Sequence, residues 1–587
     1  MQRADVPNKL KWRLEDIFKT NEDWETAFEN YKSSYPKLAE FKGKLSNSDT
    51  LLEFLNLRES LSLVLSKLYV YARMRKDEDT ANSLYQGMSD RAENLAVESS
   101  SLTSFVMPEL VQISDENLDK MISDERFKDY DVLLKEVKRN KKIILSAAEE
   151  KILADVGSFS DGARQIFSMF DNADIRFKDV ILPDGTAVKM SHGVYSLLLQ
   201  NENQNVRKDA FESMFEVYKN NENTLAQIYA TNVKKDWFYA KTRGFKSSLE
   251  YAMYGENVSD VAYKNLLKAV EKGLKPLHEY VALRKDALKV DTLNMYDLYV
   301  PIVENQDIKL EYPDACSLVK EALKPLGEEY GKLLDTAFGE GWIDVCETKG
   351  KRSGAYSWGT YGVHPFVLLN YQKTLHDVFT IAHELGHAMH SYKSNEALPS
   401  SKADYEIFVA EIASTVNEVL LIKHLLKTAT GDMRKYLLSY YLDMFRTTLF
   451  RQTMFAEFET AAHSLAENGE PITAEELNSI YYGLNKKYYG EAVNHNKLIE
   501  VEWARIPHFY TSFYVYKYAT GLTSAISIVK HILNGETDGY FKFLSAGGSM
   551  PPLEILKLAG VDMYGMKPFD DAMSEFEAIV EELKKCI

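Results

Sequence analysis

Cysteine and long apolar runs are scarce in this sequence. Its three cysteines in 587 residues lack the paired C-x-x-C spacing of a disulfide framework or a thiolate zinc site, so a reducing, cytoplasmic location is expected. No apolar run approaches the roughly 18 residues that span a bilayer, and the first residues lack the apolar core of a signal peptide. We therefore expect no membrane partner.

Positive charge is also in the minority. The chain has 70 lysines and arginines against 87 aspartates and glutamates, a formal net charge of −17. Phosphates repel such a surface unless a basic patch is concentrated locally. The longest basic run, 135–142, still contains a glutamate and has the pattern of a solvated helix face. No nucleic-acid partner is expected.

Only 15 prolines interrupt the chain, which leaves room for long helices. Apolar residues at helical spacing fill most of it, with expected capping boxes at Thr50 with Glu53 and at Thr473 with Glu476. Three segments have β-type patterns instead: a hairpin turning at 183–185, an extended segment over 294–303, and a glycine-rich and aromatic-rich stretch over 339–372 that predicts a small sheet. The length exceeds that of one hydrophobic core, so more than one lobe is expected.

The segment "FTIAHELGHAMHSY" contains the motif H-E-x-x-H at His383 to His387. On a helix these two histidines lie about 40° apart and can reach one ion, while Glu384 points about 100° from His383, beside the metal. Thr374 with Asp377 predicts the start of this helix. The pattern is typical of a zinc site in which the glutamate is the base.

A third ligand must complete such a site, and several residues compete for the role. His390 lies on the same helix face, but its side chain would have to bend back towards the ion. "DYEIFVAEIASTVNEVLL" offers further acids, of which Glu411 alone lies in an apolar helix with small neighbours that allow close helix packing. Glu418, two turns later, could hold a ligand histidine from behind. A surface position for Glu418 is an equal alternative.

"HELGHAMH", "EIAS" and "PHFYTSFYVYKYATG" together resemble the thimet oligopeptidase family of zinc metallopeptidases, in particular its oligoendopeptidase F branch. The resemblance implies a mostly α-helical fold, two helical lobes around a deep channel, with a small sheet next to the zinc helix. We expect a mostly helical N-terminal lobe over 1–190 and a zinc metallopeptidase catalytic domain over 191–587. The resemblance also implies one Zn²⁺ per chain on His383, His387 and Glu411, with Glu384 as the base. Glu411 is thus favoured over His390 as the third ligand, and His390 is expected beside the site.

The implied function is hydrolysis of internal bonds in short oligopeptides, since a deep channel excludes folded proteins. The resemblance favours His508 and Tyr514 as groups that stabilise the tetrahedral intermediate. Tyr510 and Tyr518 rank behind them and are expected to bind substrate. Core packing is the alternative for this aromatic run, and in particular for Tyr516. Gly354 and Tyr356 are expected near the substrate on a sheet edge, with a buried structural hairpin as the alternative.

Two other functions stay open. A zinc carboxypeptidase or dipeptidyl carboxypeptidase would use the same motif, with Arg352 or Arg505 to bind the terminal carboxylate. A catalytically silent peptide-binding protein of the same fold is the other, although the intact Glu384 opposes it. A monomer or weak homo-oligomer is expected.

Overall fold

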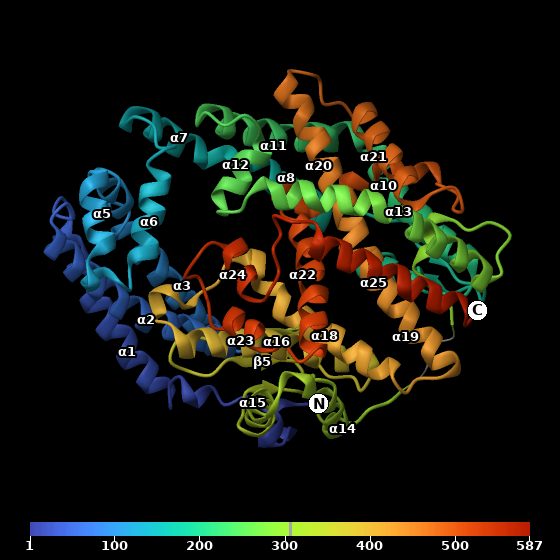
Figure 1. The fold of residues 1–587 in the computed structure, drawn as a ribbon, viewed down its shortest axis with the longest axis horizontal. Helices are drawn as coiled ribbons and strands as arrows, with labels where there is room; N and C mark the ends of the chain where they lie inside the picture. The colour runs from blue at the N-terminus through green and yellow to red at the C-terminus, as the bar shows by residue number, and fades with distance from the viewer. Residues whose placement is uncertain (304–307) are drawn as a thin grey trace. The chain divides into compact units, whose positions relative to one another are not determined.

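The computed structural model describes residues 1–303 and 308–587, and most of them are helical (Figure 1). Contacts divide the chain into two compact units: Met1–Ile144, Asp307–Leu421 and Ile528–Val561 form the first, and Leu145–Gln306, Ile422–Ser527 and Asp562–Ile587 form the second. The predicted mostly helical class is confirmed. Among the described residues, no helix is both long and apolar enough to cross a lipid bilayer.

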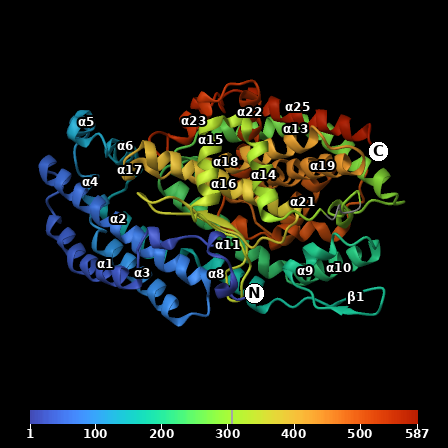
Figure 2. The same cartoon turned by 90° about the horizontal axis from the view of Figure 1, so that it is seen from below.

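The first unit begins with helices packed around α2 (Ser48–Glu78). They are α1 (Asn21–Ser34), α3 (Ser83–Leu102), α4 (Val106–Leu110), α5 (Asp115–Ser123) and α6 (Asp131–Asn140). Figure 2 shows α1 and α3 beside α2, whose leucines Leu61 and Leu68 are buried. The predicted cap at Thr50 and Glu53 is wrong: α2 begins earlier, where the Asn47 side chain accepts the Thr50 backbone N–H.

A three-stranded sheet follows α14 (Tyr312–Ala322) and α15 (Glu328–Gly339) in the first unit. Its strands are β3 (Ile343–Asp344), β4 (Tyr356–Trp358) and β5 (Phe366–Leu368), in the order β3-β5-β4. β5 is parallel to β3 and antiparallel to β4, so β4 has one open edge. Phe366 and Leu368 are buried in the same core as α2. The sheet predicted within 339–372 is therefore confirmed.

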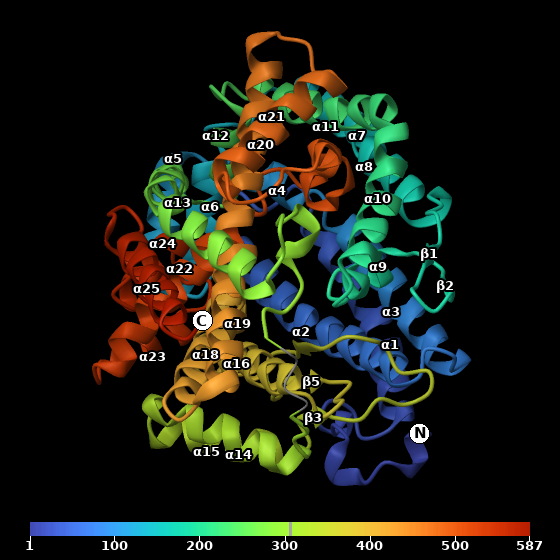
Figure 3. The same cartoon turned by 90° about the vertical axis from the view of Figure 1, so that its right-hand side faces the viewer.

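The sheet leads into α16 (Leu375–Ala397), which contacts both β4 and β5. Thr374 and Asp377 form the predicted capping box at its start. After the short α17 (Ser400–Ala403), α18 (Ile407–Leu426) lies beside α16, as Figure 3 shows. α23 (Asp538–Leu544) and α24 (Pro552–Leu558) complete this unit, and α23 also contacts α16.

The described part of the second unit is mostly helical and contains one hairpin. Its helices include α7 (Ala147–Ser160), α8 (Gly162–Met169), α9 (His192–Leu198), α10 (Gln204–Asn220), α11 (Glu222–Thr242), α12 (Ser248–Gly255), α13 (Asp260–Leu288), α19 (Gly431–Met444), α20 (Arg451–Asn468), α21 (Ala474–Tyr489), α22 (Tyr516–Leu533, up to Ser527) and α25 (Lys567–Lys584). The predicted hairpin is confirmed as β1 (Val180–Ile181) and β2 (Ala187–Val188). Thr473 caps α21 as predicted. The extended segment predicted over 294–303 is wrong, because Met295–Leu298 is a 3₁₀ helix.

Candidate active site

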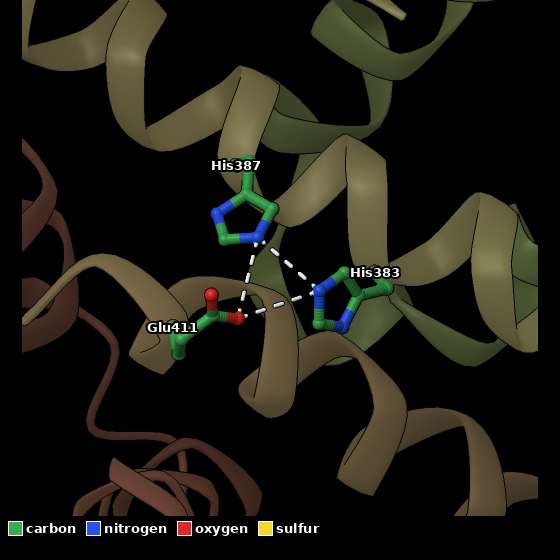
Figure 4. A group of neighbouring side chains, drawn as sticks. All are labelled: His383, His387 and Glu411. Atoms are coloured by element: carbon green, nitrogen blue, oxygen red, sulfur yellow. Dashed lines mark hydrogen bonds and ion pairs between the residues drawn. The ribbon is translucent and has the colours of Figure 1, made fainter. Parts of the chain in front are cut away.

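Two helices of the first unit bring three potential metal ligands together. His383 and His387 lie one turn apart on α16, and Glu411 comes from the first part of α18 (Figure 4). The two histidine Nε2 atoms are 3.2 Å apart, and each lies 3.5 Å from Glu411 Oε2. Ligands bound tetrahedrally at 2.0–2.1 Å from an ion are about 3.4 Å apart, so these three donor atoms fit one ion.

The close packing of α16 on α18 makes this group possible. A side chain at Gly386 would place its Cβ 2.5 Å from Ser414 Cα and 2.6 Å from the Ala413 carbonyl oxygen. Only glycine therefore permits this helix separation. The expectation that the small residues of α18 allow a close approach to α16 is confirmed at Ala413 and Ser414.

The charges around the histidines favour a cation between them. Burial opposes protonation of His383, but its interactions with Glu411 and Glu418 outweigh burial and raise its pKa to about 10. Hydrogen bonds from His383 and His387 lower the pKa of Glu411. Without metal, His383 and Glu411 together hold a proton strongly. A metal ion bound by the same side chains can replace that proton.

Glu384 follows His383 on α16 and is only 7% exposed. Burial raises the pKa of its carboxyl, opposed by the charges of His383 and His387. The backbone N–H of Ser357, in β4, also interacts with this carboxylate. Glu384 is therefore a buried acid held beside the metal-ligand group by its own helix and by the sheet.

The direction of the Ser357 N–H follows from the sheet pattern. Val367 and Leu369 donate their backbone N–H groups to Trp342 and Asp344, on the β3 side, at 2.8 Å. The alternate residues of β5, Phe366 and Leu368, therefore direct their backbone groups to β4, where they pair with Trp358 and Tyr356. Ser357 lies between those two residues, so its polar backbone groups point to the open edge of the sheet.

The substrate residues expected on this strand differ in position. Gly354 is exposed, has φ +83°, and its carbonyl oxygen accepts a hydrogen bond from Asn370 at 2.8 Å. The Tyr356 hydroxyl donates to Asp77 of α2 at 2.9 Å. The Tyr356 side chain thus anchors the strand to α2, while the backbone of β4 stays available at its open edge.

His390 lies on α16 but is buried apart from the ligand group. Its ring stacks on Tyr405, with centroids 3.8 Å apart and planes 4° apart, and also contacts Phe543. Neither ring nitrogen has a hydrogen-bond partner within the described part of the chain. Burial, and then the charge of His387, lower the pKa of His390 to about 3. His390 is thus a neutral packing residue in this structure.

The residues expected to stabilise the intermediate belong to the second unit. The rings of His508, Tyr514 and Tyr518 form a cluster with centroid separations of 5.6–6.0 Å. Tyr510 instead stacks on Phe167 at 4.4 Å and is 6% exposed. Tyr516, for which core packing was one reading, is fully buried and donates to Glu256.

Two contacts at the site have little signal in the sequence. Ser357 reaches Glu384 only through the strand register, and its residue type carries no information about that contact. Gly386 occupies a variable position of H-E-x-x-H, where a glycine inside a helix is the only hint of close packing.

The chain is similar to known peptidases over its whole length. The model of peptidase family M3 matches residues 197–575, and the model named oligopeptidase F matches residues 109–177. Oligopeptidase PepF of Bacillus subtilis (strain 168) is 41% identical over 591 residues, covering 100% of this chain and 88% of that protein. An oligoendopeptidase F homolog of Lactococcus lactis subsp. lactis (strain IL1403) is 39% identical over 592 residues, covering 100% of this chain and 98% of that protein.

A solved structure agrees with these matches. The crystal structure of oligoendopeptidase-F from Enterococcus faecium superposes with a TM-score of 0.75 at 34% identity, covering 96% of this chain and 99% of that one. The resemblance read from the sequence motifs is confirmed. The chain therefore belongs to peptidase family M3, in its oligopeptidase F group, and is a metal-dependent endopeptidase of oligopeptides.

Proposed function

We propose that the metal is Zn²⁺, one ion per chain, held by His383, His387 and Glu411. Two imidazoles and one carboxylate, with a position left for water, are a donor set typical of catalytic zinc. The separations of 3.2–3.5 Å between the donor atoms support this assignment. Glu418, 3.1 Å from His383 Nδ1, would hold that ring with its Nε2 lone pair towards the ion.

Glu384 is the proposed general base. Zinc, when bound, lowers the pKa of water and polarises a carbonyl group. Glu384 takes the proton of the attacking water and passes it to the leaving amine nitrogen. Its burial supports this role, because a raised pKa brings a carboxylate closer to the pH at which it can both accept and return a proton.

The open edge of β4 is the proposed binding site for the substrate backbone. A peptide that adds to this edge as a further strand would meet the outward-facing backbone of Ser357, next to Glu384. Gly354, exposed in the segment before β4, would lie along the same peptide. Tyr356 would act on the substrate through its backbone, since its hydroxyl is bonded to Asp77.

His508 and Tyr514 are the proposed donors to the developing oxyanion, with Tyr518 in support. The clustering of their three rings supports a shared role. Tyr510 as a substrate-binding residue stays a prediction, and its burial against Phe167 favours packing. We also retain 1–190 as an N-terminal lobe and 191–587 as the catalytic domain, which the separate family matches at 109–177 and 197–575 support.

The carboxypeptidase alternative has less support. It needs an unpaired cation for the terminal carboxylate, but Arg352 lies 3.4 Å from Asp77 and Arg505 lies 3.4 Å from Glu502. The silent peptide-binding alternative is opposed by the intact base. Three free cysteines support a reducing location, and we propose cytoplasmic action as a monomer or weak homo-oligomer.

The observation that carries the proposal is the buried Glu384 beside three converging ligands. Its test is the Glu384→Gln variant on an N-acetylated, C-amidated peptide, with Glu396→Gln, an exposed position of the same helix, as control. We expect about one zinc per chain in both variants, with cleavage lost only in Glu384→Gln. Cleavage of the blocked peptide by the wild type excludes the carboxypeptidase reading. Full activity in Glu384→Gln contradicts the mechanism.

A further inference from the structure

A cavity of about 600 Å³ lies in the first unit, next to β4. Its walls come from α2, from β4 and the segment after it, from α16, and from the segment 400–405. Its lining residues include Glu59, Ser357, Ser391, Asp404 and Tyr405. The size falls within the range of about 300–1,000 Å³ that is common for ligand sites.

The cavity borders the catalytic group. Ser357, whose backbone N–H interacts with Glu384, is part of its wall. Ser391, also in the wall, follows the ligand His387 by one turn of α16. A peptide strand along the open edge of β4 would therefore pass the mouth of this cavity, and one of its side chains could enter.

The walls carry negative charge without a matching cation. Glu59 and Asp404 line the cavity, and among the described lining residues there is no lysine, arginine or histidine. Glu59 accepts a hydrogen bond from the Ser400 hydroxyl. No ion pair joins Asp404 within the described part of the chain, and the neighbouring Lys402 pairs with Asp131 instead. Asp404 is an exposed residue, and desolvation by the atoms packed around its carboxyl raises the pKa of that group.

The acidic wall is held in place by its surroundings. The Ser391 and Tyr405 hydroxyls are hydrogen-bonded at 2.9 Å, and Tyr405 stacks on His390. Behind the segment 400–405, the Gly548 N–H donates to the Lys402 carbonyl oxygen at 2.8 Å. A Cβ at Gly548 would lie 2.4 Å from the Asp404 carbonyl oxygen, so the backbone at Gly548 packs directly against the segment 400–405 with no room for a side chain. The cavity is therefore formed before any ligand binds.

We propose that this cavity binds the basic side chain, lysine or arginine, of a peptide substrate that lies along β4. The inference rests on the proposed function, because it uses the position of Glu384 and the open edge of β4. An ammonium or guanidinium group would make charge-assisted hydrogen bonds with Glu59 and Asp404. An apolar side chain of equal length would leave both carboxylates without a counter-charge in a partly desolvated space.

The test compares end-blocked peptides that carry either lysine or norleucine at one position, scanned across the cleaved bond. Norleucine has the stem of lysine without the charge. We expect one position at which kcat/KM for lysine exceeds that for norleucine by about tenfold, the effect of one charge-assisted bond. The ratio should fall to about one in Asp404→Asn and decrease in Glu59→Gln. Glu53→Gln, an exposed acid of α2 outside the cavity, is the matched control and should keep the ratio.

Several outcomes would overturn the proposal. They are the absence of a preferred lysine position, a ratio unchanged in both cavity variants, and a preference that appears only when the peptide has a free α-amino group. Calorimetric binding of both peptides to the Glu384→Gln protein separates this proposal from the proposed function. A lysine preference in Kd that Asp404→Asn removes supports the cavity whether or not Glu384 proves to be the base.

Discussion

Glu418 Oε1 on α18 lies 3.1 Å from Nδ1 of His383 on α16. This contact assigns the Nδ1 proton and leaves Nε2 of His383 as the atom that faces His387 and Glu411. A carboxylate behind a ligand histidine fixes the ring orientation and makes the free nitrogen more basic. This contact favours the prediction that Glu418 supports a ligand histidine over the alternative of a plain surface acid.

Replacing Glu418 with alanine should weaken metal binding about 10- to 100-fold, because the ring loses its orienting acceptor. Glu418→Gln keeps an acceptor oxygen and should lie between alanine and wild type. Competition with a chromogenic chelator measures the affinity, and Glu406→Ala, an exposed acid just before α18, serves as control. Equal affinity in Glu418→Ala and wild type would show that the contact has no effect on the metal.

Gly386→Ala should destabilise the protein and release metal, because the added Cβ would lie 2.5 Å from Ser414 Cα. Overpacking of this kind costs roughly 1–3 kcal/mol of folding stability. To make room for the Cβ, α18 must move away from α16, which separates Glu411 from the two histidines. Thermal unfolding and metal content measure the two effects. Gly483→Ala is the control: this glycine inside α21 has open space around it, so alanine should stabilise the helix by roughly 0.5–1 kcal/mol.

His390→Phe should increase stability, and the gain should grow as the pH falls. Burial lowers the pKa of folded His390 to about 3, so below pH 6.5 the unfolded chain binds a proton that the folded chain does not. The wild type then loses about 1.4 kcal/mol of stability for each pH unit, and phenylalanine removes this loss while it keeps the stack on Tyr405. Unfolding midpoints at pH 7 and pH 5 test the prediction, with metal content unchanged. Loss of metal in this variant would instead indicate that His390 is a metal ligand.

Tyr514→Phe should lower kcat about 10²- to 10³-fold with a smaller effect on KM, because an oxyanion donor acts mainly in the transition state. Removal of His508 should have a similar effect. Tyr229→Phe is a suitable control, since this buried hydroxyl in the same unit has no hydrogen-bond partner in the described part of the chain. A change confined to KM in Tyr514→Phe would move the residue from intermediate stabilisation to substrate binding.

Local patterns predicted the site well where one element contains the whole feature. H-E-x-x-H placed His383 and His387 on one helix face with Glu384 beside them, because the helix repeat alone determines these directions. The Thr374 cap and the hairpin around 183–185 were equally local, and both are confirmed. The start of α2 was mispredicted although it is local, because Asn47 competes with Thr50 as the cap and both are good N-cap residues.

Sequence by itself therefore determined the helical class, the family, and the pair of histidines with their glutamate. Only the tertiary structure decided that α18 approaches α16 at Gly386, that Glu418 contacts His383, that Ser357 meets Glu384, and that His390 is buried against Tyr405. Each of these contacts joins residues of different elements. Their existence depends on helix separation and strand register, which arise from packing of the whole unit and from no local pattern.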